Sequence, residues 1–295
     1  MKPEPIDLET FLSADGKVGF RLWTDRLLTW LCIGLSLLTL IPLFSILFLV
    51  VKNGLPMIGL STFTQLPPAA GTTGGGFGNA IVGTAFMVGV ALVLAVPIGI
   101  LSAIYIQEYA PVSRLSDAVR FVAKLLTGIP SIISGVFAFA IIVMTTKTFS
   151  AFAGGVALAV LILPTILLTA EQALMGVPKA YREASFGLGA TPFQTIWRIV
   201  LPEAFPAMMS GVMLAVARAA GETAPVLFTA LFSNYWMKSP MEPTASLSVL
   251  IYNFSTLPDA YLIQMAWAAS LILVCIVTLT NISAQFLFSK KQQGH

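Results

Sequence analysis

The feature that most constrains this chain is a series of long apolar runs without charge. Leu27–Val51 contains no Asp, Glu, Lys or Arg, and no charged residue occurs between Lys52 and Glu108. A helix needs about 20 mostly apolar residues to cross a bilayer. Only 10% of the 295 residues are charged, whereas soluble domains contain about 25%. The chain is therefore predicted to be an all-α polytopic membrane protein, and a cytosolic enzyme, a disordered chain or a nucleic-acid binder is excluded.

Apolar runs and helix-breaking residues divide the chain into six predicted membrane helices. Prolines and the glycine-rich segment 71–78 exclude a span directly after the first one, because neither continues a helix. The predicted helices are Leu27–Val51, Asn79–Gln107, Leu125–Thr146, Thr148–Ala170, Ala204–Met237 and Ala260–Ser289. Residues 27–289 thus form one membrane domain, between a charged N-terminal tail (1–26) and a short C-terminal tail (290–295).

The distribution of positive charge predicts the orientation of these helices. Six spans place both termini on one side, and cytoplasmic segments carry an excess of Lys and Arg. With both termini inside, the outside loops hold only Lys52, Lys147 and Lys238, and most other basic residues lie inside. The many charges of residues 1–26 exclude a cleavable signal peptide. Both tails are therefore predicted to be cytoplasmic.

The longest hydrophilic inside segment after the N-terminal tail, residues 171–203, is predicted to contain two short helices. Pro178 suits the first turn of one helix, and Gly189 suits its end. Thr191 can cap a second helix that has Pro192 at its first position. The segment is therefore predicted to be a helix–turn–helix at the membrane face, and the alternative is a plain solvated connector.

Two charged residues, Arg218 and Glu222, interrupt the predicted fifth helix. Arg218 lies about 21 Å along the axis from Ala204 at 1.5 Å per residue, too far for its side chain to reach the cytoplasmic face. A buried arginine in a membrane costs at least about 2.5–3.5 kcal/mol, so we expect it to face a partner or a water-filled cavity. The spacing of four places both residues on one face. They form either a structural ion pair or a site where the guanidinium binds two oxygens of a tetrahedral oxyanion.

Several chemistries are absent from the sequence. The only histidine is His295, so we expect no histidine-dependent catalysis and no metal site. No G-x-x-x-x-G-K-[ST] loop occurs, so ATP hydrolysis must belong to a partner. The glycine cluster of residues 74–78 is expected to be a flexible outside connection. An intramembrane enzyme lacks paired catalytic residues, and a self-sufficient channel or proton-driven carrier remains an alternative use of Arg218 and Glu222.

The segment 171–203 resembles the EAA loop of bacterial ABC importer permeases. That pattern reads E-A-A, three residues, G, nine residues, I, one residue, L-P. The matching residues are Glu183, Ala184, Ser185, Gly189, Ile199, Leu201 and Pro202, with serine in place of the second alanine. The resemblance implies that this loop, including Arg182, inserts into a surface groove of an ATP-hydrolysing subunit.

A second resemblance narrows the family. Residues 218–225, R-A-A-G-E-T-A-P, resemble a segment of phosphate importer permeases, whereas sulfate and molybdate permeases share it only up to G-E. Residues 76–83 and 129–135 also resemble the PstA-type permeases. The resemblance implies a type I ABC importer permease fold and an anion path that includes Arg218, Glu222 and Thr223.

By this resemblance the chain is a phosphate permease subunit of the bacterial inner membrane that works by alternating access. The implied partners are a homologous PstC-like permease, two PstB-like ATPase subunits that bind ATP and Mg, and an extracytoplasmic PstS-like phosphate-binding protein. Outside loops 52–78 and 238–259 would meet the binding protein. No cofactor is expected in this chain. The alternatives are a permease for sulfate, molybdate or tungstate, and the companion PstC-type subunit.

Overall fold

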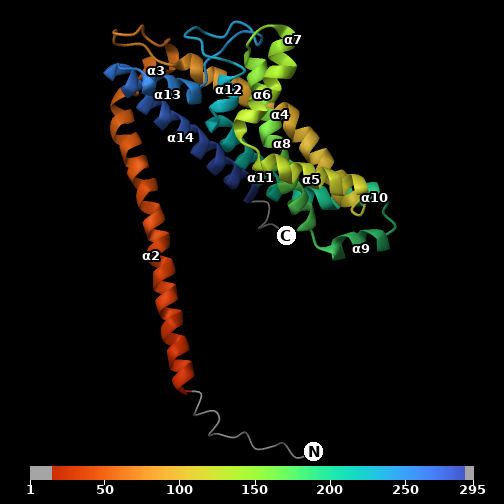
Figure 1. The fold of residues 1–295 in the computed structure, drawn as a ribbon. Coiled ribbons are helices and arrows are strands. Elements are labelled where there is room, and N and C mark those ends of the chain that lie inside the picture. Colours follow the sequence, from red (N-terminus) through yellow and green to blue (C-terminus); the bar gives the residue numbers. More distant parts are fainter. Residues whose placement is uncertain (1–14, 290–295) are drawn as a thin grey trace, which may run out of the picture. The chain divides into compact units, whose positions relative to one another are not determined.

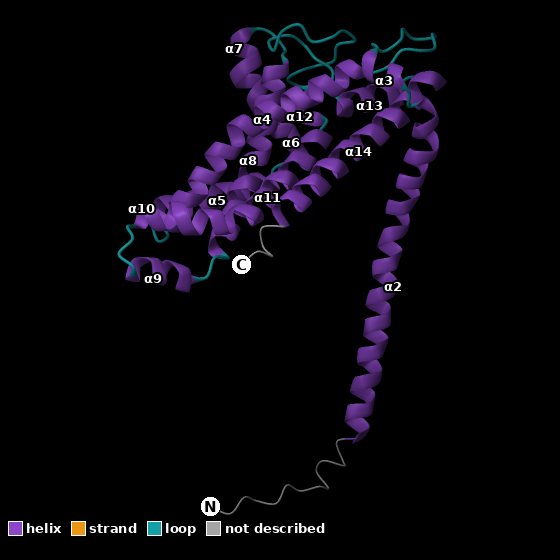
Figure 2. Cartoon of the chain, turned by 180° about the vertical axis from the view of Figure 1, so that it is seen from behind, coloured by secondary structure: helices purple, strands orange, loops and turns teal. Residues whose placement is uncertain are grey.

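The computed structural model describes residues 15–289, and the side chains of residues 22–283. Within this range the chain consists of helices and loops and contains no strand (Figures 1 and 2). It divides into two compact units at Lys52/Asn53, which are described separately. The predicted all-α class is confirmed. The C-terminal tail and residues 1–14 lie outside the described part.

The N-terminal unit is formed by the long helix α2 (Asp15–Gly54). It begins at Asp15 rather than at Leu27, so residues 15–26 of the predicted tail are helical. Pro42 lies inside the helix without ending it, as membrane helices tolerate. Apolar residues occur all around α2 between Leu22 and Phe48, as in a helix that crosses a membrane.

In its described residues, the larger unit contains four further helices that are long and apolar enough to span a membrane. With α2 the count is five, or up to six if one bent helix pair counts as a span. The spans of this unit are α4 (Gly78–Ile104) with the π-helical η2 (Tyr105–Tyr109), α8 (Ala151–Met175), the continuous α10–η4–α11 (Pro192–Thr195, Ile196–Val200, Leu201–Gly221), and α14 (Ala260–Ser289).

The predicted third span is a bent pair rather than one helix. Helix α5 (Arg114–Gly128) and the segment Ser131–Thr146, formed by α6 (Ser131–Ala138), η3 (Phe139–Val143) and α7 (Met144–Thr146), meet at 108°. The break is at Pro130, whose extended backbone (ψ 135°) does not continue a helix. The predicted start at Leu125 is therefore wrong, because that residue lies inside the amphipathic α5.

The predicted fifth span ends too late. Helix α11 ends at Gly221, and Glu222 has an extended backbone with φ −75° and ψ 127°. After a short helix α12 (Ala224–Leu227), the chain is irregular up to α13 (Leu247–Thr256). The predicted end at Met237 is wrong because the apolar composition continues beyond the point where the helix stops. Helix α13 lies in a segment that the sequence predicts to be an outside loop.

The core forms where α4 and α8 lie side by side (Figure 1). Small residues allow the two backbones to approach, as in other membrane helix pairs. A Cβ at Gly155 would lie 2.6 Å from the Val90 side chain, and one at Gly99 would lie 2.8 Å from Ile166. Helix α11 packs on α8, and α14 packs on both α11 and α13.

Residues 75–78 of the glycine cluster are packed rather than a flexible connection. The cluster lies against helix α3 (Leu60–Thr64). A Cβ at Gly76 would lie 2.1 Å from the backbone carbonyl oxygen of Ser61, and a Cβ at Gly78 would lie 2.1 Å from that of Phe63. The Phe77 N–H donates to the Thr62 carbonyl at 3.0 Å. Glycine is therefore required here by close backbone approach, and the expectation of flexibility is wrong.

Candidate functional site

Segment 171–203, called the coupling loop below after the role that the resemblance implies, contains the predicted first helix and turn, but its second helix is the start of the span α10–η4–α11 rather than a short helix. Helix α9 (Lys179–Gly187) follows Pro178, and the turn contains Gly189 with a left-handed φ of +83°. Thr191 accepts a hydrogen bond from the Gln194 N–H, while the Gln194 side chain accepts one from the Thr191 N–H. This reciprocal cap starts α10 at Pro192. Local capping chemistry thus accounts for the shape of the loop.

Ser185 has a specific partner in the coupling loop. Its hydroxyl lies 2.8 Å from the Thr195 hydroxyl, and both residues are buried. The contact joins α9 to α10. Its neighbours Glu183 and Ala184 are exposed. The serine at the second alanine position of the pattern therefore provides a hydrogen bond between the two helices that alanine cannot make.

The outer side of the coupling loop exposes apolar side chains. These are Tyr181, Phe186, Leu188, Phe193 and Trp197, and Leu188 is 90% exposed. The rings of Phe193 and Trp197 lie 5.8 Å apart between centroids. Exposed apolar groups gathered on a polar segment are typical of a protein interface. Further along, Pro202 is exposed, whereas Ile199 and Leu201 are half-buried toward the bundle.

Arg182 points into its own chain rather than outward. Its Nη2 and Nε donate to the Glu108 carboxylate at 2.6 and 3.2 Å, and the guanidinium also donates to the carbonyls of Leu174 and Val177. Glu108 belongs to η2, at the end of α4. Sequence reasoning missed Glu108, because nothing local to either residue indicates a partner 74 positions away.

A second, partly buried ion pair also joins distant parts of the chain and was also missed. The Nε of Arg120 on α5 donates to the Glu171 carboxylate at 2.5 Å. Its terminal nitrogens donate to the carbonyls of Ile106 and Pro111. The only sequence signal for this pair is a glutamate within the apolar face of α8.

The predicted pairing of Arg218 and Glu222 is confirmed, although the pair lies at the end of α11 and not inside a longer helix. Arg218 is in the last turn, and its Nε lies 3.4 Å from Glu222 Oε1. The two side chains are 37% and 18% exposed. Thr223 follows as the half-buried cap residue of α12, and its carbonyl accepts from the Leu227 N–H.

Other segments hold the turn that follows the charged pair. The Ser248 hydroxyl of α13 donates to the Glu222 carbonyl at 2.8 Å. A Cβ at Gly135 would lie 2.6 Å from the Pro225 Cα, so α6 packs closely against α12. The structure therefore brings together residues 129–135 and 218–225. Sequence reasoning missed Ser248, which has no distinguishing local signal.

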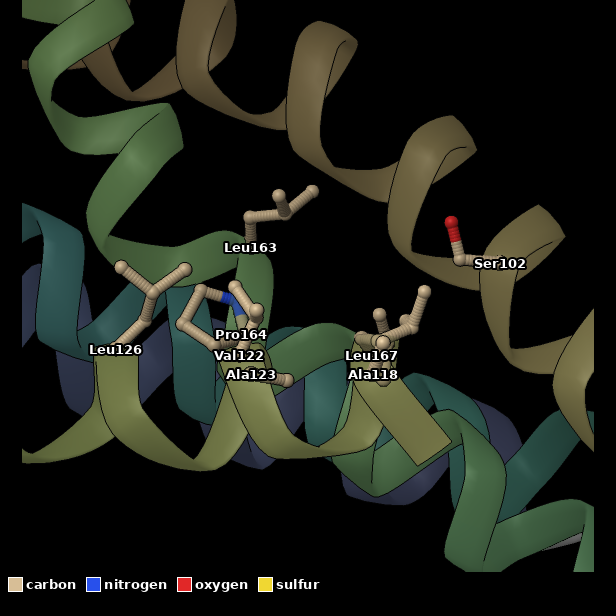
Figure 3. A pocket seen from close by; sticks show the side chains of 9 residues that line it. Ser102, Ala118, Val122, Ala123, Leu126, Leu163, Pro164 and Leu167 are labelled. Carbon is tan, nitrogen blue, oxygen red and sulfur yellow. The ribbon is translucent and has the colours of Figure 1, made fainter. Parts of the chain in front are cut away.

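An apolar cavity of about 300 Å³ lies apart from the charged pair, between α4, α5 and α8 (Figure 3). Ser102 supplies its one hydroxyl, and apolar side chains form the rest of the wall. Pro164 and Leu167 face it from α8, and Val122 and Leu126 face it from α5. The cavity contains none of the predicted site residues, and its lining offers no charge for an anion.

The described part of the chain is thus a set of membrane-length helices with apolar side chains exposed on segment 171–203. Residues 95–293 match the family described as binding-protein-dependent transport system inner membrane component, and the chain belongs to this family. It is an ABC importer permease.

Relatives of this chain match it over nearly its whole length. The phosphate transport system permease protein PstA of Yersinia pestis is 37% identical over 276 residues, which cover 94% of each chain. The PstA of Haemophilus influenzae is 37% identical over 266 residues, covering 89% of this chain and 94% of the relative.

Solved structures share the fold at lower identity. A chain of a bacterial ABC transporter that imports the acidic polysaccharide alginate matches with a TM-score of 0.62 and 21% identity, over 92% of this chain and 99% of the other. A chain of the MetNI methionine ABC transporter in an inward-facing conformation matches with a TM-score of 0.56 and 20% identity, over 72% and 92%. The predicted type I ABC importer permease fold is confirmed.

Proposed function

We propose that this chain is the PstA-type permease subunit of a phosphate importer. The support is the 37% identity to a PstA permease over 94% of both chains, together with the R-A-A-G-E-T-A-P segment at residues 218–225. The chain then carries inorganic phosphate inward by alternating access. ATP and Mg belong to partner ATPase subunits, because this sequence has no phosphate-binding loop of its own.

The proposed assembly contains a homologous PstC-like permease, two PstB-like ATPases and a PstS-like binding protein outside. The excess of Lys and Arg in the segments between spans supports cytoplasmic termini. A chain of the alginate transporter solved with a pentasaccharide-bound periplasmic protein shares this fold. The exposed apolar side chains of the coupling loop, including Leu188 and Phe193, are suited to an ATPase groove.

The observation that carries the anion role of Arg218 is a contrast among three arginines. Arg120 and Arg182 each donate to a carboxylate and to two or more further acceptors. Arg218 makes one contact of 3.4 Å through Nε. Among residues 22–283, the structure gives its two terminal nitrogens no hydrogen-bond partner. A planar pair of free N–H groups matches two oxygens of a tetrahedral oxyanion.

We also infer a role for Glu222 in release of the anion. Its carboxylate lies beside Nε and leaves the outer edge of the guanidinium free. A bound phosphate therefore competes with a neighbouring negative charge, which lowers its affinity for the site. The carboxylate keeps Arg218 oriented while the site is empty and opposes trapping of the anion when it is full.

The test is phosphate uptake by the complete complex in membrane vesicles. Arg218→Gln should lower uptake at least tenfold, since a charge-assisted hydrogen bond contributes about 1.5–3 kcal/mol. Arg218→Lys keeps the charge but loses the fork, and should give an intermediate rate. Lys124→Gln removes an exposed charge from α5 and is the matched control. Normal uptake by Arg218→Gln in an assembled complex would contradict the anion role and favour a structural pair.

Competition experiments test the substrate. Unlabelled phosphate should block uptake of labelled phosphate, whereas sulfate, molybdate and tungstate should not at the same concentration. Equal competition by any of these oxyanions would contradict the assignment to phosphate. A chain purified alone should neither conduct ions nor transport, because alternating access requires the second permease and the ATPases.

A further inference from the structure

We propose that Glu108 and Arg182, together with Arg120 and Glu171, form an internal joint that passes movement of the coupling loop to the membrane helices. The four residues belong to η2, α9, α5 and α8. None of them faces the outer side of the loop. They are positioning residues for transport, and the inference rests on the proposed function because the movement originates in the ATPase subunits.

Arg182 attaches α9 to two different elements. Its bidentate contact holds the Glu108 carboxylate, whose side chain is only 8% exposed. Its remaining donors bond the carbonyls of Leu174, in the last turn of α8, and Val177 beyond it. Carbonyls at a helix end lack partners within the helix. A displacement of α9 therefore pulls on the ends of both α4 and α8.

Arg120 makes a parallel set of contacts from α5. It bonds Glu171 on α8, the Ile106 carbonyl in η2 and the Pro111 carbonyl between η2 and α5. Ile106 and Glu108 lie two residues apart in the same π-helical turn. The segment η2 is thus held by both α5 and α9. π-Helical turns within longer helices are frequent at functional sites.

Packing around the joint is uneven, so the polar contacts matter for α5. A small cluster of Ile106, Ala123 and Leu167 lies beside the joint. The cavity of about 300 Å³ between α4, α5 and α8 borders this cluster, because Ala123 and Leu167 line it as well (Figure 3). Close packing transmits movement between helices, and beside the cavity part of the α5 surface lacks it. The hydrogen bonds of Arg120 add to the apolar packing that attaches α5 to α8 and η2.

The experiment uses the complete complex in proteoliposomes with inorganic phosphate, and measures phosphate transported per ATP hydrolysed. Glu108→Gln removes the charge that Arg182 binds. It should leave copurification of the ATPase subunits intact but lower the transport ratio by about 5- to 150-fold, the usual range for coupling between sites. Asp117→Asn is the control. The Asp117 carboxylate is 76% exposed, and its contact with Arg120 is long, at 3.5 Å.

Two further variants distinguish a joint from a merely structural contact. Arg182→Lys keeps the charge but loses the bidentate contact, so its ratio should also fall. The double variant Arg182→Lys/Glu108→Gln should have a transport ratio no lower than that of the more impaired single variant. Both substitutions disrupt the same interaction, so their effects should not add. An unchanged ratio in an assembled complex overturns the joint. Loss of ATPase copurification also overturns the joint, because these residues would then serve docking of the ATPase. Failure of every variant to fold overturns it too, because the residues would then serve stability.

Failure of the proposed function would look different. The unaltered complex would then transport no phosphate, or would transport another oxyanion with the same efficiency. The joint is judged only on the ratio of transport to hydrolysis relative to that unaltered complex. A complex that transports a different anion with a normal ratio would correct the substrate and leave the joint standing.

Discussion

The hydroxyl of Ser248 donates a hydrogen bond of 2.8 Å to the backbone carbonyl of Glu222. Helix α11 has ended at Gly221, so this carbonyl lies beyond the helix and α13 supplies its donor. The side chain of Glu222 meanwhile holds Arg218. The orientation of the charged pair therefore depends on a residue 26 positions further along the chain.

Ser248→Ala should lower phosphate uptake several-fold. Loss of one hydrogen bond costs about 0.5–1.5 kcal/mol, which is at most about tenfold if all of it is expressed in the site. Uptake at saturating phosphate in vesicles is the measurement. Ser270→Ala is the control, because the Ser270 hydroxyl bonds only within its own helix, to the Ala266 carbonyl. Equal rates for the two variants would show that α13 does not orient the pair.

Glu222→Gln should retain phosphate for longer than the unaltered chain. The substitution removes the negative charge beside the guanidinium, so a bound anion is opposed less. Release of labelled phosphate from the purified complex is the measurement. The double variant with Arg218→Gln should lose this retention. Faster release from Glu222→Gln would mean that the carboxylate supports anion binding rather than opposing it.

Gly189→Ala should weaken coupling, whereas Gly187→Ala should not. Gly189 has φ +83°, and the left-handed region costs a residue with a Cβ about 1–2 kcal/mol. Gly187 is two residues earlier, has an ordinary helical φ and has no atom within 4 Å of a Cβ. Phosphate-stimulated ATPase activity of the complex is the measurement. A normal rate in Gly189→Ala would show that the turn adapts without strain.

Gly83→Ala should destabilise the fold, whereas Gly89→Ala on the same helix should not. A Cβ at Gly83 would lie 2.0 Å from the Ala245 carbonyl oxygen, and a Cβ at Gly89 meets nothing within 4 Å. Overpacking costs about 1–3 kcal/mol, while alanine in a helix is favoured over glycine by about 1 kcal/mol. Thermal unfolding of the purified protein in detergent should separate the two. Equal Tm values would contradict the close approach of this segment to α4.

Acid should release the loop that Asp259 holds. Hydrogen bonds from the Gly71 and Leu262 backbone N–H groups lower the pKa of Asp259. The ordinary pKa of an aspartate is about 3.9, and the pKa of Asp259 in the folded loop is lower. At pH values above the ordinary pKa, the ionised Asp259 therefore stabilises the folded loop. This stabilisation is lost as the pH falls through the pKa of the folded state. The protection of the amides of residues 69–75 against hydrogen exchange, relative to the unfolded chain at the same pH, should therefore be high at neutral pH and fall in strong acid.

Asp259→Asn should give fast exchange in this loop already at neutral pH. Glu242→Gln is the control, because it removes an exposed carboxylate from another loop at this end of the bundle. Slow exchange in Asp259→Asn at neutral pH would show that the contact between Gly74 and the Tyr261 hydroxyl holds the loop without the carboxylate.

Features set by neighbouring residues could be predicted from the sequence. Gly189, Thr191 and Pro192 act within a few positions, so the coupling loop follows from capping rules. The spacing of four between Arg218 and Glu222 likewise predicts their contact. Both depend on interactions whose partners are visible together in the chain.

Features set by distant packing could not be predicted. Glu108 and Arg182 are 74 residues apart, and each would also suit a solvated position. The bend at Pro130 is ambiguous in sequence, since prolines such as Pro97 and Pro164 lie inside continuous helices. Because of the charged residues of α5, the third span is predicted from the sequence to start only at Leu125. An amphipathic helix carries polar residues on one face, so its composition resembles that of a loop. Which proline bends a helix depends on what packs around the freed carbonyl.

The opposite charges of Arg218 and Glu222 have an electrical consequence. The pair lies 3.4 Å apart and carries no net charge. Moving it through the electric field of a polarised membrane therefore requires almost no work, whereas each uncompensated charge requires about 2.3 kcal/mol per 100 mV. In a transport cycle built on this pair, the return of the empty site is insensitive to voltage, and the membrane potential acts only on the step that carries the anion.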